Sequence, residues 1–223
     1  LEFRRVLFRS AASRRFPSYL APAMTQLPEL PLTLSRQEIR KMIRQRRRAL
    51  TPEQQQEMGQ QAATRMMTYP PVVMAHTVAV FLSFDGELDT QPLIEQLWRA
   101  GKRVYLPVLH PFSAGNLLFL NYHPQSELVM NRLKIHEPKL DVRDVLPLSR
   151  LDVLITPLVA FDEYGQRLGM GGGFYDRTLQ NWQHYKMQPV GYAHDCQLVE
   201  KLPVEEWDIP LPAVVTPSKV WEW

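Results

Sequence analysis

The chain has 223 residues, 45% of them hydrophobic, and a formal net charge of +3 at pH 7, which is enough material to bury one sizeable core. The longest apolar run, residues 151–161, is interrupted by Pro157 and is much shorter than the roughly 20 residues that cross a bilayer, so we expect no membrane-spanning helix. The single cysteine, Cys196, excludes an internal disulfide framework and is typical of a reducing compartment, so we expect a cytoplasmic protein.

The basic residues are concentrated at the beginning of the chain. Residues 1–50 contain twelve of the 26 Lys and Arg residues but three of the 23 Asp and Glu residues, a net charge of +9, whereas residues 51–223 carry −6. Residues 1–23 have no helical or strand period and precede Met24, so we interpret them as a non-native or disordered leader and residues 24–223 as a single domain. Without the leader the net charge is −1, so the overall basicity says little about nucleic acid.

Two consecutive helices are expected after this leader. Apolar residues recur at helical spacing through residues 32–50, and Ser35 is the expected N-cap, with Glu38 completing a capping box. A second start signal follows at Thr51, where Pro52 occupies the first helical position. The sequence therefore predicts a helical N-terminal arm.

The hydrophobic period then changes to that of an α/β protein. We expect a buried strand over 77–84, a helix over 89–101 that ends on glycine, and another strand over 102–109. Such a βαβ unit favours a parallel sheet that is covered on both faces. The predicted fold class is therefore α/β, a three-layer α/β/α Rossmann-like domain with a mostly parallel sheet.

The second half of the chain continues this pattern less regularly. The expected elements are, in order, an edge strand over 116–123, a short helix leading into a turn over 126–138, a buried strand over 151–161, a helix over 174–185, and strands over 188–194 and 212–217.

A glycine cluster follows the most hydrophobic of these strands, in the stretch RLGMGGGFYDR from Arg167 to Arg177. Four of the ten glycines fall within residues 169–173, which indicates a backbone that needs unusual torsions or a close approach. In an open α/β sheet this edge binds ligands, and the N–H groups of a following helix attract anions. We therefore expect a phosphate site whose cations come from Arg167, Arg177 and the arginine-rich first helix.

The glycine pattern does not match the standard nucleotide motifs. It lacks the Lys-Ser or Lys-Thr ending of a P-loop and the third glycine of the dinucleotide fingerprint. A tight turn of small residues explains the glycines alone equally well. The flanking Arg167 and Tyr175-Asp176 favour a site, because a carboxylate beside bound phosphate is suited to ligate Mg²⁺.

The residues RLGMGGGFYD resemble the hallmark of the 5-formyltetrahydrofolate cyclo-ligase family, also called 5,10-methenyltetrahydrofolate synthetase, which is Arg-Leu-Gly-x-Gly-x-Gly-Tyr-Tyr-Asp. Phe174 replaces the first tyrosine of this pattern. The resemblance extends from about Arg36 to Thr216 through segments in the family's order. These segments are Arg36-x-x-x-Arg40, FLSFDGELDT, the IHEP turn, PLVAFDEYGQRLG and LPVEEWDIPLPAVVTP.

The resemblance implies an ATP-dependent ring closure. 5-Formyltetrahydrofolate and ATP would give 5,10-methenyltetrahydrofolate, ADP and phosphate, with Mg²⁺ and through a phosphorylated formyl intermediate. Transfer of this kind needs positioning and charge neutralisation more than a covalent nucleophile. The partners implied are a folate substrate and ATP, with neither membrane nor nucleic acid, and the chain is expected to be a monomer or weak oligomer.

The resemblance also implies roles for individual residues. Catalytic roles fall to Arg167 and Tyr175, and metal ligation to Asp176 and Asp208. Arg36 stands where the family commonly has lysine, and Phe174 lacks the hydroxyl of the family's tyrosine. The ATP site would comprise Arg36, Arg40, Arg167, Leu168, Gly169, Met170, Gly171, Gly172, Gly173, Phe174 and Tyr175, and the folate site Leu82, Glu87, Met170, Gly171, Gly172, Gly173 and Phe174.

Each of these assignments has a ligand-free interpretation as well. Arg36 and Arg40 could belong to a solvated helix face, and the arginine run 44–48 is more typical of such a face. Glu87 could cap the next helix, Asp176 could favour a helix N-terminus electrostatically, and Asp208 could be a turn residue.

Two other functions remain open at this stage. A sugar-phosphate isomerase or CoA-transferase-like enzyme on a similar scaffold would use the same anion loop. A nucleic-acid-binding module would use the arginine-rich first helix. The histidines show no zinc-ligand spacing and no GxSxG motif occurs, which argues against a zinc site and against an α/β-hydrolase.

Overall fold

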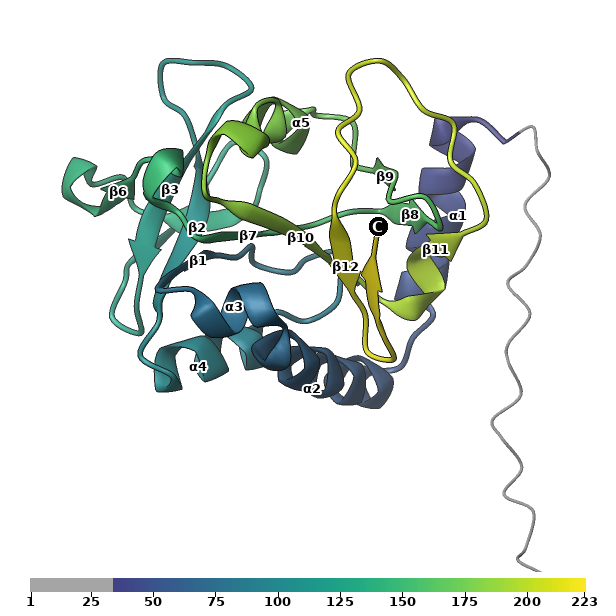
Figure 1. Cartoon of the computed structure of the whole chain (residues 1–223), viewed down its shortest axis with the longest axis horizontal. Helices are drawn as coiled ribbons and strands as arrows, with labels where there is room; N and C mark the ends of the chain where they lie inside the picture. The colour runs from purple at the N-terminus through teal and green to yellow at the C-terminus, as the bar shows by residue number, and fades with distance from the viewer. Residues whose placement is uncertain (1–33) are drawn as a thin grey trace, which may run out of the picture.

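The structure, a computed structural model, describes residues 34–223 (Figure 1), so the expected leader at residues 1–23 lies outside the described residues. An eight-stranded sheet forms the centre of the fold, in the strand order β13-β12-β10-β7-β1-β2-β3-β6. The strands are β1 (Thr77–Ala79), β2 (Arg103–Leu109), β3 (Leu117–Tyr122), β6 (Val145–Leu146), β7 (Val153–Thr156), β10 (Gln188–Tyr192), β12 (Ala213–Val215) and β13 (Val220–Glu222).

The middle of this sheet is parallel, as the sequence predicts. β12, β10, β7, β1 and β2 pair in parallel, and antiparallel pairs add β3 and β6 at one side and β13 at the other. In the centre, Val78 of β1 is in register with Val104 of β2 and Val153 of β7. The five parallel strands therefore end at a common border, which we call the carboxyl edge.

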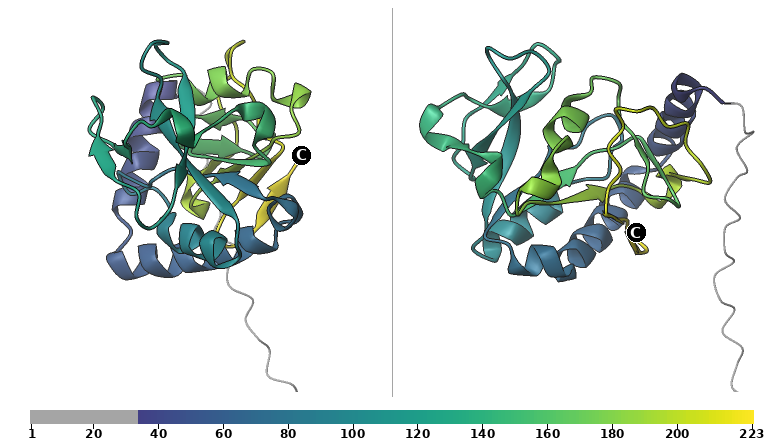
Figure 2. Two further views of the ribbon diagram at one scale, coloured as in Figure 1. Left: turned by 90° about the vertical axis from the view of Figure 1, so that its left-hand side faces the viewer. Right: turned by 45° about the horizontal axis from the view of Figure 1, so that its top comes forward.

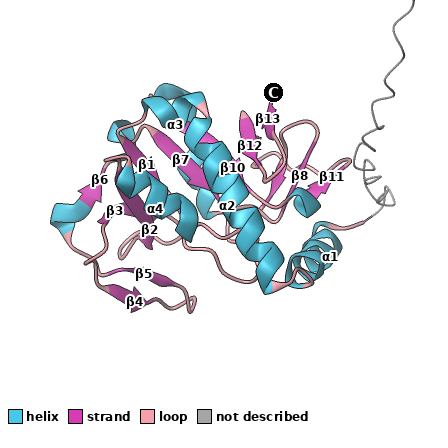
Figure 3. Cartoon of the chain, turned by 90° about the horizontal axis from the view of Figure 1, so that it is seen from below, coloured by secondary structure: helices cyan, strands magenta, loops and turns pink. Residues whose placement is uncertain are grey.

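Helices cover both faces of the sheet, so the three-layer α/β/α fold is confirmed. Three helices lie on one face, which Figure 3 shows from below, and Met66 and Leu97 of this layer pack with Val78 in one apolar cluster. α5 lies on the other face, where Leu179 packs with Leu154. The helices of these layers are α2 (Pro52–Thr68), α3 (Pro70–Met74), α4 (Gln91–Arg99) and α5 (Phe174–Leu179).

α1 (Arg36–Arg48) docks on a second, smaller sheet (Figure 1; purple in Figure 2). Ile39 and Ile43 of α1 are buried in one cluster with Ala160 and Leu168. The predicted N-terminal helical arm is thus packed tightly on the rest of the fold. The sheet has the order β11-β8-β9, with β8 (Ala160–Asp162), β9 (Arg167–Leu168) and β11 (Leu198–Val199).

Both predicted helix starts have the expected caps. The Ser35 hydroxyl accepts a hydrogen bond from the Glu38 backbone N–H at 3.3 Å, and the Glu38 carboxylate accepts one from the Ser35 N–H at 2.8 Å. Thr51 forms the equivalent capping box with Gln54, and Pro52 follows the cap. These bonds satisfy N–H groups that have no partner within the helix, so they fix where α1 and α2 begin.

The helix predicted over 126–138 is wrong, because this segment forms a hairpin of β4 (Leu128–Met130) and β5 (His136–Pro138). The amide oxygen of Asn131 accepts hydrogen bonds from the backbone N–H groups of Leu133 and Ile135. Such side-chain bonds compete with helical ones and favour a turn. The apolar spacing of the segment was therefore misread as a helical period.

Other predicted elements are shorter than expected. The strand predicted over 77–84 ends at Ala79, and that over 151–161 divides at Pro157, which has no N–H for a ladder hydrogen bond, into β7 and β8. The helix predicted over 174–185 ends at Leu179. The remaining elements are short 3₁₀ turns, namely η1 (Val142–Asp144), η2 (Leu148–Arg150), η3 (Trp182–His184) and η4 (Asp195–Gln197). Among residues 34–223 no helix is long and apolar enough to span a membrane.

Gly165 closes the turn between β8 and β9, and we predict that alanine at this position destabilises the fold. Its φ is +79°, and an added Cβ would lie 2.8 Å from the Leu211 carbonyl oxygen. Gly101 is the matched control, because its φ is +71° but nothing lies within 4 Å of an added Cβ. Gly101→Ala should lower the free energy of unfolding by about 1–2 kcal/mol through the torsion alone.

Gly165→Ala should lower the free energy of unfolding by a further ~1–3 kcal/mol, since the clash with main chain forces the backbone to shift. Urea unfolding of both variants measures the difference. Equal losses in the two variants would show that the contact with Leu211 carries no cost.

Candidate active site

A cavity of about 670 Å³ opens at the carboxyl edge of the sheet. Its walls are formed by the segments that follow β1 and β7, by the end of β2, by α1 and by the glycine loop, which we define as residues 169–173. The volume lies within the range that is typical of small-molecule sites. The cavity therefore lies at the edge where the βαβ pattern predicts a ligand site.

Nearly all residues expected at the site line this one cavity. Three do not, since Leu168 is buried in the cluster beneath α1, Asp208 contacts the site through Arg36, and Arg177 lies behind the glycine loop on the Gly115 and Gly172 carbonyl oxygens. The lining residues expected from the sequence are Arg36, Arg40, Leu82, Glu87, Arg167, Gly169, Met170, Gly171, Gly172, Gly173, Phe174, Tyr175 and Asp176.

The glycine loop is held against α1 through its main chain. Arg40 donates a hydrogen bond from Nε to the Gly169 carbonyl oxygen at 2.7 Å. Gly171 and Gly173 have φ values of +101° and +67°, which L side chains rarely adopt. A Cβ on Gly171 would lie 3.6 Å from Nη2 of Arg40, which is ordinary contact, so the torsion and not the space requires glycine there. The structure thus supplies the first of the two reasons that the sequence gives for the cluster, the unusual torsions.

Two arginine–carboxylate pairs surround the loop. Arg36 donates from Nη1 and Nη2 to the two carboxylate oxygens of Asp208, and the distance from Nη2 to Oδ1 is 2.9 Å. Arg167 forms an ion pair with Asp176. Partial burial opposes ionisation of Asp208, but hydrogen bonds from Arg36 and the Glu205 backbone leave its pKa lowered. The pairs therefore place ionised groups of both signs beside the glycine loop.

Arg167 is almost completely buried, and its Nε has no hydrogen-bond partner among residues 34–223. Arg177, by contrast, donates to the carbonyl oxygens of Gly115 and Gly172 and does not line the cavity. It supports the loop and does not supply the free cation that the sequence predicts. α5 has six residues, so its dipole contributes less than a longer helix would. The positive charge at the site therefore comes mainly from Arg36, Arg40 and Arg167.

Among residues 34–223 no group of three or more His, Cys, Asp and Glu side chains gathers in a way that could hold a metal by itself. Asp176 and Asp208 are nevertheless close to the same arginines, because both carboxylates act on Arg36 and Arg167 electrostatically. Mg²⁺ is commonly bound by one or two carboxylates together with phosphate oxygens. This donor set therefore fits a magnesium ion that arrives with a nucleotide.

The opposite wall of the cavity carries Glu87, which is 8% exposed. Burial raises the pKa of its carboxyl to about 7, although the charge of Arg47 acts in the other direction. Burial and the nearby Glu87 carboxylate raise the pKa of the Tyr175 phenol, so the phenol stays protonated and is able to donate. Glu87 does not cap α4, since its Oε2 accepts a hydrogen bond from the Phe84 N–H at 3.2 Å.

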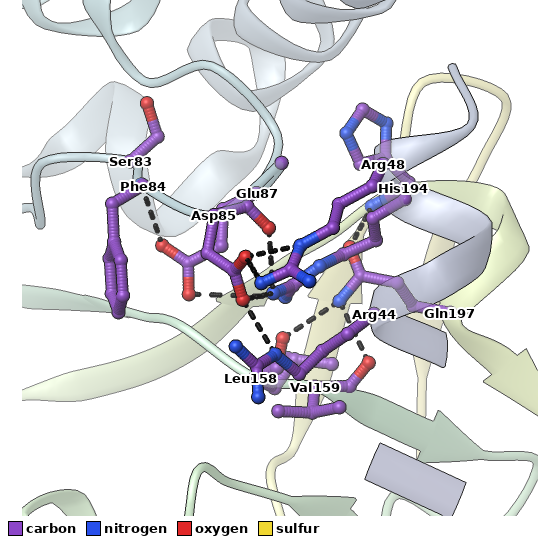
Figure 4. A network of polar contacts seen from close by, with 12 residues as sticks. Arg44, Arg48, Ser83, Phe84, Asp85, Glu87, Leu158, Val159, His194 and Gln197 are labelled. Carbon is purple, nitrogen blue, oxygen red and sulfur yellow. Dashed lines mark hydrogen bonds and ion pairs between the residues drawn. The ribbon is translucent and has the colours of Figure 1, made fainter. Parts of the chain in front are cut away.

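The interpretation of residues 44–48 as a solvated face is wrong for Arg47, whereas Arg48 is exposed and Arg44 partly exposed, although both are held in ion pairs. Arg44 and Arg48 each donate to the Asp85 carboxylate at 2.6 Å, and Figure 4 shows both side chains converging on Asp85. Arg47 is fully buried and donates to the Asp85 carbonyl oxygen at 3.1 Å. Sequence spacing alone does not reveal this contact, because Asp85 lies 38 residues beyond Arg47.

Further residues at the cavity were given no role by the sequence. The β4–β5 hairpin contributes Asn131, Leu133, Ile135, His136 and Glu137, and the C-terminal segment contributes Trp207. The IHEP motif at 135–138 was the sequence signal that could have indicated these residues. Its place at the cavity depends on the hairpin, which the sequence analysis did not predict.

Comparisons with known proteins identify the family of the chain. The model of the 5-formyltetrahydrofolate cyclo-ligase family matches residues 33–217. A Haemophilus influenzae protein named 5-formyltetrahydrofolate cyclo-ligase is 53% identical over 179 residues, which cover 80% of this chain and 96% of the relative. A Mycolicibacterium smegmatis protein of the same name is 31% identical over 188 residues, covering 83% and 95%.

A solved structure shows the same fold. The NMR structure of Aquifex aeolicus 5,10-methenyltetrahydrofolate synthetase has a TM-score of 0.73 and 28% identity, and the match covers 85% of this chain and 93% of that one. The resemblance drawn from the sequence motifs is thus confirmed across nearly all described residues.

We predict that Glu87 makes the free energy of unfolding fall as pH rises. Its pKa is raised from 4.5 to about 7 in the folded state, so the folded protein retains a proton that the unfolded chain releases between these values. Glu87→Gln removes this titration. Relative to the wild type, the variant should therefore gain about 3 kcal/mol between pH 4.5 and 7, at ~1.4 kcal/mol per pH unit.

Denaturant unfolding of both proteins across this pH range measures the gain. Burial lowers the pKa of His194 to about 4, which makes stability rise with pH, but this effect is common to both proteins and cancels in their difference. A difference that stays constant with pH would contradict the raised pKa of Glu87.

Proposed function

Because the chain belongs to the 5-formyltetrahydrofolate cyclo-ligase family, we propose that this enzyme uses ATP to close 5-formyltetrahydrofolate into 5,10-methenyltetrahydrofolate. The observation that supports this most strongly is the single cavity that joins a cationic wall of Arg36, Arg40 and Arg167 to a wall carrying Leu82 and Glu87. Transfer between two substrates requires that they meet in one site. The cavity offers a phosphate half and a folate half within one enclosure.

In this proposal the triphosphate binds along the glycine loop. Its negative charges are met by Arg36, Arg40 and the buried Arg167, whose Nε is free to donate. Guanidinium groups bind phosphate oxygens with two parallel hydrogen bonds, and they act more strongly where water is excluded. Mg²⁺, held by Asp176 and Asp208 with the phosphates, would further neutralise the charge on the transferring group.

The folate half would orient the formyl group. Glu87 accepts hydrogen bonds from pterin N–H groups, and the protonated Tyr175 phenol is able to donate to an oxygen at the reacting centre. Phe174 has no hydroxyl, so its contribution is apolar contact. The apolar residues around the cavity exclude water from the phosphorylated intermediate, which water would otherwise hydrolyse.

The chemistry then proceeds in two steps. The formyl oxygen attacks the γ-phosphorus, an O–P bond forms, and ADP leaves. N10 of the folate next attacks the activated carbon, loses its proton, and expels phosphate to leave the methenyl bridge. Phosphorylation is needed because the oxygen of a formamide is a poor leaving group. The side chains bind, orient and neutralise charge without forming a covalent bond to substrate.

The alternatives gain no support from the structure of α1. A nucleic-acid module would need free cations on this helix, but Arg47 is fully buried, and Arg44 and Arg48 are paired with Asp85 although they remain partly exposed. Incubation with 5-formyltetrahydrofolate and Mg-ATP separates the proposal from an isomerase or transferase. We expect methenyl absorbance to grow in step with ADP, and neither product would form if the anion loop served a reaction that spares ATP.

We predict that Arg40→Ala weakens ATP use selectively. A charge-assisted hydrogen bond contributes about 1.5–3 kcal/mol, so KM for ATP should rise roughly 10- to 100-fold while KM for folate changes little. Lys41→Ala is the matched control, because Lys41 is an exposed basic residue on the same helix that does not line the cavity. Steady-state kinetics with each substrate varied in turn measures both constants. An increase confined to the folate KM would refute the phosphate role of Arg40.

We predict that Asp176→Asn raises the requirement for Mg²⁺. The amide retains a hydrogen-bond acceptor for Arg167 but lacks the charge that a hard cation prefers. The concentration of Mg²⁺ that gives half-maximal activity should therefore increase at least about tenfold, the loss expected from a weakened ligand set. Activity measured over a Mg²⁺ series, with the melting temperature recorded for the same samples, tests this. A folded variant with an unchanged Mg²⁺ dependence would exclude Asp176 as a ligand.

A further inference from the structure

Arg47 occupies an unusual place for an arginine, because its side chain is fully buried between α1 and the segment that carries Asp85 and Glu87. Nη2 donates to the carbonyl oxygen of Asp85 at 3.1 Å and lies 3.4 Å from its carboxylate. Nη1 lies 3.9 Å from Oε1 of Glu87, the carboxylate at the cavity wall. A buried guanidinium is costly unless it is paired, so Arg47 and these two carboxylates form one electrostatic unit.

The turn that carries both carboxylates is built against α1. We call residues 84–87 the Asp85 turn, which is closed by a hydrogen bond from the Glu87 N–H to the Phe84 carbonyl oxygen at 3.0 Å. Asp85 and Gly86 have φ values of +54° and +74°, and a non-glycine residue seldom adopts such a torsion without compensation. Hydrogen bonds from Arg44, Arg47 and Arg48 of α1 to Asp85 supply that compensation, and Figure 4 shows those of Arg44 and Arg48.

The turn also fits α1 closely at its main chain. A Cβ on Gly86 would lie 3.3 Å from the carbonyl carbon and the Cβ of Arg47. Gln55 donates to the carbonyl oxygens of Arg47 and Gly86, which ties α2 to both. The position of Glu87 at the cavity is therefore set by α1, although Arg47 of this helix and Glu87 lie 40 residues apart in the chain.

Four charged or titratable groups face Glu87 from the elements packed around it. They are Arg47 from α1, Asp85 from the same turn, Tyr175 from α5 and His194 from the segment after β10. Asp85 opposes ionisation of Glu87, the phenol of Tyr175 is neutral, and neither ring nitrogen of His194 has a hydrogen-bond partner among residues 34–223. His194 is neutral near pH 7 because burial lowers its pKa to about 4. Arg47 is thus the cation that faces Glu87.

We propose that Arg47 is a positioning residue, which holds Glu87 in place and in its negatively charged form at the folate half of the cavity. The inference rests on the proposed function for the role of Glu87 toward folate. Arg40 and Arg47 are seven residues apart, which is about 10 Å along a helix. One helix therefore supports both halves of the site, with Arg40 at the glycine loop and Arg47 behind the Asp85 turn.

The pH dependence of KM for folate tests the proposal, because a merely structural role would weaken binding equally at every pH. In the wild type KM should rise as pH falls below about 7, and Glu87→Gln should remove this midpoint. Arg47→Met should move the midpoint upward by about one pH unit or more, the size expected from losing a neighbouring charge. KM for ATP at pH 8 should change little.

Two variants control for damage to the turn. Arg48→Met removes an arginine that holds Asp85 but has no contact with Glu87, so it should leave the midpoint in place. Asp85→Asn removes a negative charge beside Glu87, tolerates the positive φ, and should move the midpoint downward. Opposite shifts in Arg47→Met and Asp85→Asn support the proposal. An unmoved midpoint in Arg47→Met, or a shift of equal size in Arg48→Met, would overturn it.

A second readout does not depend on the reaction. The pH-dependent stability difference between wild type and Glu87→Gln reports the titration of Glu87 directly, and the same pair in the Arg47→Met background should titrate at higher pH. If Arg47→Met does not fold, the same comparison is made between Asp85→Asn proteins with and without Glu87→Gln. In that background Glu87 must titrate at lower pH for the proposal to stand. Failure of catalysis with these shifts intact would refute the proposed function alone, whereas unchanged titration would refute the role of Arg47.

Discussion

The docking of α1 on the small sheet is the contact on which both halves of the site depend. Ile39 and Ile43 bury one side of the helix in an apolar cluster, and this fixes the direction in which its arginines point. Arg40 then contacts the glycine loop and Arg47 the Asp85 turn. Neither loop has a regular hydrogen-bonded ladder of its own at these positions, so each takes its position from the helix. The first helix of the described chain is thus part of the cavity wall.

Most of the arginines at the cavity are paired with carboxylates, and Arg40, which donates to the Gly169 carbonyl oxygen, is the exception among them. Arg36 and Arg167 are paired with Asp208 and Asp176, and Arg47 with Asp85 and Glu87. Unpaired buried charges would cost several kcal/mol each, so these carboxylates permit a dense group of cations in a partly enclosed cavity. In the proposed reaction, phosphate oxygens bind the same arginines and a magnesium ion binds the same carboxylates. In that proposal, the paired charges of the cavity exchange partners with a triphosphate and its metal ion.

Local signals predicted much of the fold, and long-range contacts decided the remainder. The starts of α1 and α2 follow from capping boxes that lie within four residues, and the βαβ period placed the parallel sheet. The position of the hairpin at 128–138 could not be predicted in this way, because Asn131 closes its turn locally but Glu137 joins it to β2, through a hydrogen bond that its carboxylate accepts from the Leu109 N–H. Burial of Arg47 likewise depends on Asp85. The motif residues come together at the cavity as the resemblance implies, whereas the supporting residues behind them carry no local signature.

The central claim is that α1 brings guanidinium groups to a triphosphate lying along the glycine loop. A crystal structure of the protein with a non-hydrolysable ATP analogue and Mg²⁺ tests it most directly. The account predicts phosphate oxygens within hydrogen-bond distance of Arg36 and Arg40 and of the main chain at 169–173. A triphosphate bound elsewhere, with Arg40 still on the Gly169 carbonyl and Arg36 still on Asp208, would contradict it.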